Sequence, residues 1–557
     1  MSDLYRYSNV FSAYLMLSEK YDPPAQPNVL AGEVWEFWKG NVPVERQEEW
    51  QRMLSDQINY YWKHRADEEL QEYTVTPDRA TIRLAEAVLK PRFGPKQFYN
   101  QLIARAGARL PVLRVEDLVP GSQLLSGNPL SGAYTRQGWE EAVSELFEKS
   151  PEEMEKNPIL KANVERSGVD IREELKRLYR EDYRTQWKNF FAGVKVGPFV
   201  DLEDAVGKIA KLAGGNSELF EFLQKSLERG ELKGDDFEKQ LASDFQTLSD
   251  LLKGELKGRG EKPAKDTYLE EDLPELNKRM QEGAESFKGK TNCGASLQSL
   301  VNNMSSRRDY ATRGVVWDAL GTKEFLQKPF EAAREAAFGD ACQCLNEIWT
   351  AKIREPFVRE LAGIYPFSPA DKEATVAQMQ AFLGREQGLL WFEEKEIRPA
   401  RETGMRFSAE YDSLAVQAKA LYPGEALGLA FTLEADARNF RPTSGRGVVQ
   451  EAQLTLGAQA PFAYRMGVKI PWEFLWKPSD PNGELSLKVQ GLRCEPKSFT
   501  GPWALFRLFD AGVLQPGGVA WDFDCGGFAF RAEYGLKGDF LARGHFQGLK
   551  LPEKICP

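Results

Sequence analysis

The apolar residues of this chain change their spacing once, near residue 420, and this change constrains the fold more than any other feature. Before about residue 400 they recur every three or four positions, as on one face of a helix. From about residue 425 they alternate, as on one face of a strand. We therefore predict an α+β protein, with a long multi-helix body of helical subdomains followed by a C-terminal antiparallel β-sandwich domain.

Length and composition divide the chain further. A chain of 557 residues is too long for one hydrophobic core, so we expect several domains. The stretch GELKGRGEKPAKD mixes glycine, proline and charge around one large apolar residue, Leu256, which is typical of a flexible linker. The predicted divisions are an N-terminal helical subdomain at 1–130, a middle helical subdomain at 131–253, the linker at 254–266, a second helical subdomain at 267–405 and the β-sandwich domain at 406–557.

The strongest helix is predicted from Ile171 to about Ala192. Asp170 and Glu173 stand at its start as a variant of the capping box, in which side chains pair with free backbone amides. The apolar stripe of this helix is rich in aromatic residues, and we interpret it as core packing rather than a cofactor groove. The stripe comprises Ile171, Leu175, Leu178, Tyr183, Trp187 and Phe190.

One hairpin of the β-domain is predicted in detail, from the string WDFDCGGFAFR. The pair Gly526-Gly527 supplies the positive φ angles of a two-residue turn. This turn sets the cross-strand pairs, which are Phe523 with Phe530 on one face and Asp522 with Arg531 on the other.

The residues form no pattern of catalytic or metal chemistry. His64 and His545 stand far apart and outside any cluster, which argues against a Ser-His-Asp site and a histidine metal site. The string Gly283–Thr291 resembles a phosphate-binding loop, but it follows a charged helical segment rather than a buried strand. We therefore expect no enzyme activity, no cofactor and no metal. The net charge of −10 disfavours nucleic acid and anionic membranes as main partners.

The six cysteines leave two interpretations open. An even count fits an oxidising compartment, yet six cysteines in a chain of this length fit free, buried thiols equally well. Cys342 and Cys344 are too close in sequence for a zinc ribbon or finger. If the protein is periplasmic, we expect a disulfide among Cys494, Cys525 and Cys556.

Four strings, in order along the chain, are similar to strings of one bacterial family. They are GAYTRQGW at 132–139, DYRTQW at 182–187, IYPFSPAD at 364–371 and GPWALFRLF at 501–509, the last being the most specific. Together they resemble the IcmF/TssM family, the inner-membrane core component of type VI secretion systems. The matches run from about residue 130 to the end, and residues 1–130 fit less sharply.

The resemblance implies a structural protein of the periplasm. A family member would cross the periplasm with its helical body and bind the outer-membrane lipoprotein TssJ through its C-terminal β-domain. It would assemble in several copies with the inner-membrane protein TssL. We expect it on the periplasmic side of the bacterial inner membrane, with a membrane anchor in an N-terminal part that is missing from this chain.

Two sets of residues are candidates for these roles. The motif residues are expected to be structural, in a short helix over one end of the sandwich: Gly501, Pro502, Trp503, Leu505, Phe506 and Arg507. Binding residues often lie on loops, so lipoprotein contact is expected in the loops Asn439–Gly447 and Lys477–Gly483. The candidates there are Asn439, Arg441, Thr443, Ser444, Lys477, Ser479, Asp480 and Asn482.

Other functions stay open from the sequence. One is an IcmF-like scaffold of a type IVB secretion system. Another is a periplasmic cell-wall-binding protein, because a β-sandwich on a helical body serves as a binding module. A third is an NTPase that would use Gly283–Thr291.

Overall fold

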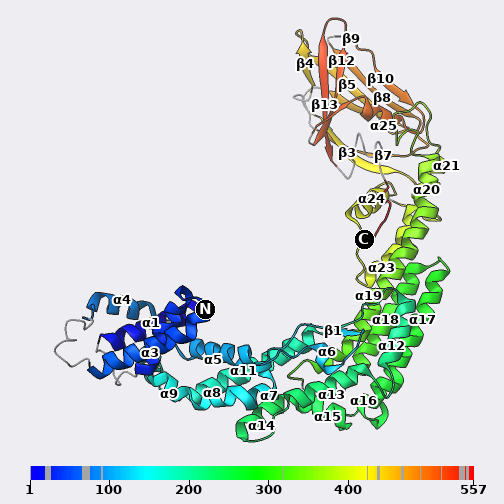
Figure 1. The fold of residues 1–557 in the computed structure, drawn as a ribbon. Helices are drawn as coiled ribbons and strands as arrows, with labels where there is room; N and C mark the ends of the chain where they lie inside the picture. The colour runs from blue at the N-terminus through cyan, green and yellow to red at the C-terminus, as the bar shows by residue number, and fades with distance from the viewer. Residues whose placement is uncertain are drawn as a thin grey trace. The chain divides into compact units, whose positions relative to one another are not determined.

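The computed structural model describes residues 2–18, 27–64, 76–89, 92–315, 318–422, 424–435, 440–465, 470–489, 491–515, 517–537, 546 and 551–556. Figure 1 shows their helices and strands. The chain divides into two compact units. The first comprises Met1–Pro198, Gly207–Glu275 and Arg307–Ala332, and the second comprises Phe199–Val206, Leu276–Ser306 and Ala333–Pro557. The five segments predicted from the sequence are contiguous stretches of chain, whereas these units are each assembled from separate stretches. The five segments therefore stay a prediction.

The first unit is mainly helical, with a short ribbon in which β1 (Leu125–Ser126) pairs with β2 (Lys195–Val196). Its helix α11 (Ile171–Gly193) confirms the strongest helix prediction, and the Asp170 side chain caps it by accepting the amide of Arg172 at 2.8 Å. The predicted stripe is buried along its length. The other helices are α1 (Ser2–Leu17), α2 (Pro27–Trp38), α3 (Gln47–His64), α4 (Arg79–Leu89), α5 (Pro95–Arg109), α6 (Val115–Leu118), α7 (Arg136–Gly138), α8 (Ser144–Glu148), α9 (Ser150–Glu155), α10 (Pro158–Ser167), α13 (Glu218–Gly230), α14 (Asp236–Ala242), α15 (Gln246–Lys253) and α16 (Ala264–Thr267).

The predicted linker, 254–266, forms a hydrogen-bonded loop. Gly254 ends α15 in the left-handed conformation, with φ of 76°. The amide of Ala264 donates to the carbonyl of Leu256 at 2.8 Å, and the amide of Gly258 donates to the carbonyl of Lys262 at 2.8 Å. The loop therefore has a defined backbone form, and its mobility stays a prediction.

Four helices have residues in both units: α12 (Leu202–Leu212), α17 (Leu273–Lys288), α18 (Cys293–Ala311) and α19 (Thr322–Trp349). Gly283 lies inside α17, where a Cβ atom would come within 2.6 Å of Leu300 Cδ2 of α18. The string that resembles a phosphate-binding loop is therefore helical as far as Lys288. Gly283, the first glycine of the string, allows α17 and α18 to pack closely. It is not part of a loop that could hold a phosphate.

The helical part of the second unit holds two buried glutamates on one π-helical turn, Glu393–Ile397. Glu396 accepts the amide of Gly294 at 3.0 Å, at the start of α18, and Glu393 accepts the hydroxyl of Tyr411 at 2.9 Å. Because a buried charge without partners is costly, these donors are what keep both carboxylates inside. The remaining helices are α20 (Glu355–Glu360), α21 (Val376–Leu383), α22 (Leu389–Phe392), α23 (Arg398–Glu402) and α24 (Ala409–Ala420).

Two antiparallel sheets face each other in the C-terminal part of this unit and confirm the predicted sandwich. One has the strand order β10-β8-β5-β6, with β9 beside β8, and the other has the order β11-β12-β13-β3-β7, with β4 beside β13. Aromatic rings fill the space between them, since Phe462 of β6 lies 5.5 Å from Trp472 of β7 and 5.9 Å from Tyr534 of β13, centroid to centroid. The strands are β3 (Leu429–Ala435), β4 (Phe440–Ser444), β5 (Val449–Leu456), β6 (Phe462–Arg465), β7 (Ile470–Trp476), β8 (Asn482–Val489), β9 (Leu492–Arg493), β10 (Lys497–Thr500), β11 (Val513–Gln515), β12 (Gly518–Asp524) and β13 (Ala529–Lys537).

The β12–β13 hairpin has the register predicted from the sequence. Phe523 lies opposite Phe530, and Asp522 lies opposite Arg531. The glycines of Gly526-Gly527 have φ angles of 68° and 99°, as the turn requires. The guanidinium of Arg531 donates from Nε and Nη2 to the two oxygens of Asp522, each at 2.8 Å, and these bonds lower the pKa of that carboxyl.

Strand β7 is the last strand in the order of its sheet, and its outer edge is blunted. The side-chain amide of Gln459 donates to the carbonyl of Leu475 at 2.8 Å and accepts the amide of Leu475 at 3.2 Å. Backbone groups alternate in direction along a strand, so Glu473 and Pro471 face the same way as Leu475. Proline has no amide to donate. Of these three outward positions, one is therefore occupied by a side chain and another lacks a donor.

Candidate docking surface and the joint that carries it

The string GPWALFRLFD builds the short helix α25 (Ala504–Asp510) and the turn before it, as predicted. Gly501 has φ of 101°, which favours glycine, and its amide donates to the carbonyl of Pro481 at 2.7 Å. Trp503 is fully buried, and its Nε1 donates to the carbonyl of Ala374 at 2.7 Å. Of the other motif residues, Leu505 and Phe506 are buried, and Gly501, Pro502 and Arg507 are half-buried.

Arg507 connects α25 to the string IYPFSPAD. Its Nε donates to Glu373 Oε1 at 2.6 Å, and its guanidinium lies 4.1 Å from the centre of the Tyr365 ring. The Tyr365 hydroxyl donates to Asp510 Oδ2 at 2.8 Å, and burial raises its pKa, so it stays a donor at neutral pH. Two strings far apart in sequence thus form one contact between the sandwich and the helical part of the second unit. We refer to residues 365–374 and 501–510 together as the joint.

The other two strings meet in the first unit. Trp187 Nε1 of α11 donates to the carbonyl of Tyr134 at 2.8 Å, and the Tyr179 hydroxyl donates to the carbonyl of Ala133 at 2.9 Å. Gly138 lies so close to Gly132 that a Cβ atom on it would overlap the Gly132 carbonyl oxygen. The residues of GAYTRQGW and DYRTQW are therefore used for internal packing and backbone pairing.

The first candidate contact segment, Asn439–Gly447, is a strand from Phe440 to Ser444 where the sequence predicted a loop, and Gly445–Gly447 follow outside the strand. Arg441, Thr443 and Ser444 lie in β4 and are exposed, while Asn439 lies outside the described residues. The loop prediction is wrong for these three because Pro442 and its polar neighbours resemble a turn. Strand β4 pairs with β13 through an irregular register near Ala529, and a marginal strand of this kind tolerates proline.

The second candidate segment lies at the joint. Lys477, Ser479 and Asp480 are in the β7–β8 loop, and Asn482 begins β8, which corrects the loop prediction at that position. The loop borders a pocket of about 440 Å³ that is also lined by Val376 and Gln380 of α21. Its Pro481 accepts the amide of Gly501, so this segment is part of the surroundings of the joint.

The first segment lies at the opposite end of the sandwich, which we term the tip: residues 441–448, 491–496 and 525–528. Strand β8 leads there from the joint, and a strand of this length spans roughly 23 Å. Figure 1 shows β4 and β9 at this end of the β-domain. The disulfide Cys494–Cys525 connects the two sheets there.

Two exposed apolar residues of the tip escaped sequence reasoning. Val448 is 56% exposed and Leu492 is 54% exposed. Each follows a glycine-containing turn, in GRGV and QGL, and this placement is the signal that could have found them. The exposed side chains of Val448 and Leu492, together with the exposed Arg441 and Arg493 of the tip, are suited to contact another protein.

The described residues contain no group of three His, Cys, Asp or Glu side chains suited to a metal ion. None of the described helices combines the length and the apolar character of a membrane span. The ring of His64 lies tilted against that of Tyr60 on α3, with 4.5 Å between the ring centroids, and His545 lies outside the described residues.

All six cysteines are paired, as Cys293–Cys344, Cys342–Cys556 and Cys494–Cys525. The prediction of a disulfide among Cys494, Cys525 and Cys556 is confirmed by the first two of these residues. Cys556 pairs instead with a residue of α19.

Comparison with protein families matches three parts of the chain. Residues 3–229 match the model described as "IcmF-related: Intracellular multiplication and human macrophage-killing". Residues 340–397 match "Type VI secretion protein IcmF helical domain", and residues 439–536 match "Type VI secretion protein IcmF C2-like domain".

Individual proteins give similar matches. The chain is 22% identical over 443 residues to "Type VI secretion system component TssM1" of Pseudomonas aeruginosa strain PAO1, which is 70% of this chain and 40% of that protein. The chain thus spans well under half the length of this relative. A solved chain of a "Type VI secretion system membrane core complex" has a TM-score of 0.45 at 18% identity, and one of a "Type VI membrane complex" has 0.47 at 19%. Each alignment covers 83% of this chain and 99% of the solved chain.

Proposed function

The chain belongs to the IcmF/TssM family of type VI secretion proteins, and from this premise we propose that it is a structural component of the type VI secretion membrane complex. The observation that carries the proposal is the structural role of the most specific string, GPWALFRLF at 501–509. Trp503 and Arg507 fasten the β-sandwich to a helical support through Ala374, Glu373 and Tyr365. A protein that presents a docking domain to a partner needs a firm contact between that domain and its support. The proposed role needs no catalysis.

The proposed location is the periplasmic side of the bacterial inner membrane. Three disulfides support an oxidising compartment, because cytosolic thiols are kept reduced. We further propose that the chain works in several copies with the inner-membrane protein TssL.

The proposed partner of the β-domain is the outer-membrane lipoprotein TssJ, bound at the tip. The tip offers the exposed apolar side chains Val448 and Leu492 beside the exposed Arg441 and Arg493. Arginine is enriched at protein interfaces, and the exposed apolar side chains add surface that a partner can remove from water. The segment at Lys477–Gly483 is the weaker candidate, because its loop lies beside α21 and the joint.

Interferometry with the full chain and the TssJ-type lipoprotein encoded beside this gene tests the proposal. The double variant Val448→Asp with Leu492→Asp should weaken binding at least about tenfold, which corresponds to about 1.4 kcal/mol. Val416→Asp is the matched control, because Val416 is 66% exposed on α24, away from the tip.

The outcomes separate the two candidate segments. If Lys477→Glu abolishes binding while the tip variant binds like the unaltered chain, the docking site is at the joint end. If the unaltered chain does not bind at all, the lipoprotein is not its partner, and a cell-wall ligand or a type IVB assembly becomes the better proposal.

A further inference from the structure

The last residues of the chain lie on the helical part of the second unit. The amide of Ile555 donates to Asn346 Oδ1 of α19 at 2.8 Å, and its carbonyl accepts the amide of Ser408 at 2.8 Å, just before α24. Trp349 Nε1, also on α19, donates to the carbonyl of Pro552 at 2.9 Å. Ile555 itself is fully buried. Residues 551–556, which we call the C-terminal tail, are therefore hydrogen-bonded to α19 and to the residue that precedes α24.

Phe546, which precedes this tail in sequence, packs at the joint. The ring of Phe546 lies 5.3 Å from Phe367 and 5.3 Å from Phe506, centroid to centroid, and it is buried. Phe367 belongs to the helical side of the joint and Phe506 to α25. A residue between β13 and the tail in sequence thus contacts both halves of the joint.

A disulfide closes this arrangement. Cys556 is bonded to Cys342 of α19, with 6.0 Å between the Cα atoms. We refer to this bond as the clasp. It joins residues 214 positions apart in sequence and gives the β-domain a second covalent attachment to the helical part, besides the chain that leads into β3.

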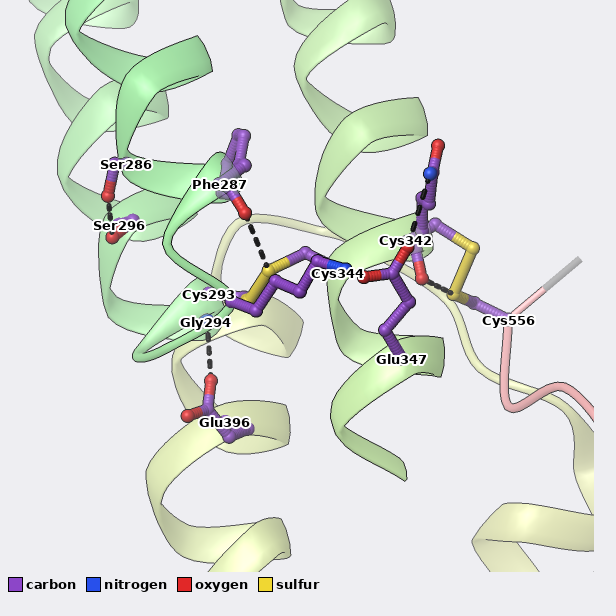
Figure 2. The surroundings of a disulfide bond; sticks show 12 residues. Ser286, Phe287, Cys293, Gly294, Ser296, Cys342, Cys344, Glu347, Glu396 and Cys556 are labelled. Carbon is purple, nitrogen blue, oxygen red and sulfur yellow. Dashed lines mark hydrogen bonds and ion pairs between the residues drawn. A yellow bond between two sulfur atoms is a disulfide. The ribbon is translucent and has the colours of Figure 1, made fainter. Parts of the chain in front are cut away.

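The clasp differs from the other two disulfides at one of its two cysteines, Cys342, because Cys556 is buried, at 2% exposure. Cys342 is half-buried and lines a pocket of about 710 Å³ together with Asn346 and Lys554. Figure 2 shows Cys342 and Cys344 leaving α19 on opposite sides, toward Cys556 and Cys293 respectively. The partners on the other side are buried, since Cys344 is 3% exposed and Cys293 is 0% exposed, although Cys344 borders a smaller pocket of about 310 Å³. At the tip, Cys494 and Cys525 are buried as well.

The pocket beside Cys342 is lined by charged side chains of both signs. Lys290, Lys352 and Lys554 line it, together with Glu347 and Glu553. The glutamates already have basic partners, because Lys290 lies 2.9 Å from Glu347 and Arg354 lies 3.4 Å from Glu553. A thiolate is the leaving and attacking form in disulfide exchange.

We propose that the clasp is a redox-sensitive bond that controls how firmly the β-domain is held at the joint. On closing, the two thiols form an S–S bond, and their two electrons and two protons pass to the disulfide of an oxidising thiol–disulfide oxidoreductase, which becomes a dithiol. On opening, a dithiol reductant attacks one sulfur, the mixed disulfide is resolved by its second thiol, and the reductant ends as a disulfide. The open clasp frees the tail and loosens the joint, whichever partner the tip binds.

Differential alkylation of the native full chain tests the accessibility step. The chain is titrated with dithiothreitol, free thiols are alkylated, and mass spectrometry identifies the labelled cysteines. Cys342 and Cys556 should be labelled at roughly tenfold lower reductant concentration than the other four, because exchange requires access to a sulfur. Equal or earlier labelling of Cys293 with Cys344, or of Cys494 with Cys525, overturns the proposal.

Hydrogen exchange tests the coupling step in the same selectively reduced protein and in the double variant Cys342→Ser with Cys556→Ser. Within residues 365–374 of the joint, the amide of Tyr365 donates to the carbonyl of Lys372 and the amide of Ala374 donates to the carbonyl of Tyr365, so their peptides should lose protection when the opened clasp loosens this segment. The double variant Cys494→Ser with Cys525→Ser keeps the clasp and should retain this protection. If the tail loses protection and the joint does not, the clasp does not control the joint. If a variant fails to fold, hydrogen exchange of the selectively reduced chain alone tests whether the clasp controls the joint.

Discussion

Replacing Trp503 by alanine should destabilise the β-domain more than other single changes considered for it. The indole is fully buried between Trp476 and Phe506, with ring centroids at 5.6 Å and 5.7 Å. Truncation of a buried tryptophan costs about 3 to 5 kcal/mol. The variant also leaves the buried carbonyl of Ala374 without its donor, which adds about 1 kcal/mol or more. We therefore expect a loss of roughly 4 to 6 kcal/mol.

Calorimetry of the full chain measures this loss. For a domain of about 150 to 250 residues, 1 kcal/mol corresponds to about 2 to 4 °C, so one transition should move down by roughly 8 to 24 °C. Trp503→Phe keeps most of the ring contact and loses the hydrogen bond, so its shift should lie between those of Trp503→Ala and the unaltered chain. Trp38→Ala is the control, because Trp38 is 40% exposed. A Trp503→Ala shift no larger than that of the control would refute the reasoning about the joint.

The remaining predictions concern packing, pH and thiols. Gly138→Ala should lower the first unit's melting temperature, since its Cβ would overlap the Gly132 carbonyl, whereas Gly207→Ala in α12, with open space around it, should be neutral or stabilising. Because hydrogen bonds from Arg531 lower the pKa of Asp522, the pair stabilises the fold above the ordinary carboxyl range, and this contribution is lost as pH falls through the lowered pKa. Asp522→Asn should therefore be less sensitive to pH in that range in acid unfolding curves, and an unchanged curve would contradict this. A thiol assay on the unreduced, denatured chain should detect no free thiol, and measurable thiol would contradict the three disulfides.

Local features were predictable because the residues that decide them are neighbours in sequence. The turn at Gly526-Gly527 and the alternation around it determine which residues of β12 and β13 face each other. Asp170 and the stripe behind it likewise decide where α11 begins and which side it buries. In both cases the energy comes from contacts within one or two elements.

The contacts of the joint join residues far apart in sequence, and the sequence alone does not indicate which residues pair. Arg507 pairs with Glu373, a residue 134 positions away, and nothing local distinguishes this glutamate from other acidic residues. Resemblance to a family indicated that Trp503 and Arg507 matter, but not what they touch. The cysteines present the same difficulty, because six allow fifteen pairings and spacing favours none of them. Strand β4 was missed since its backbone partner, β13, is decided by tertiary structure and not by the polar residues of the strand itself.

The blunted edge of β7 has a consequence for how this protein meets other chains. Strand addition joins backbones, and backbones are the same in every protein, so an open edge accepts partners with little regard to their sequence. With Gln459 paired to Leu475 and Pro471 lacking an amide, this edge is a poor template for such growth. In the proposed assembly, recognition at this face is then left to side chains. Side chains differ from one protein to another, so they can distinguish one partner from the next.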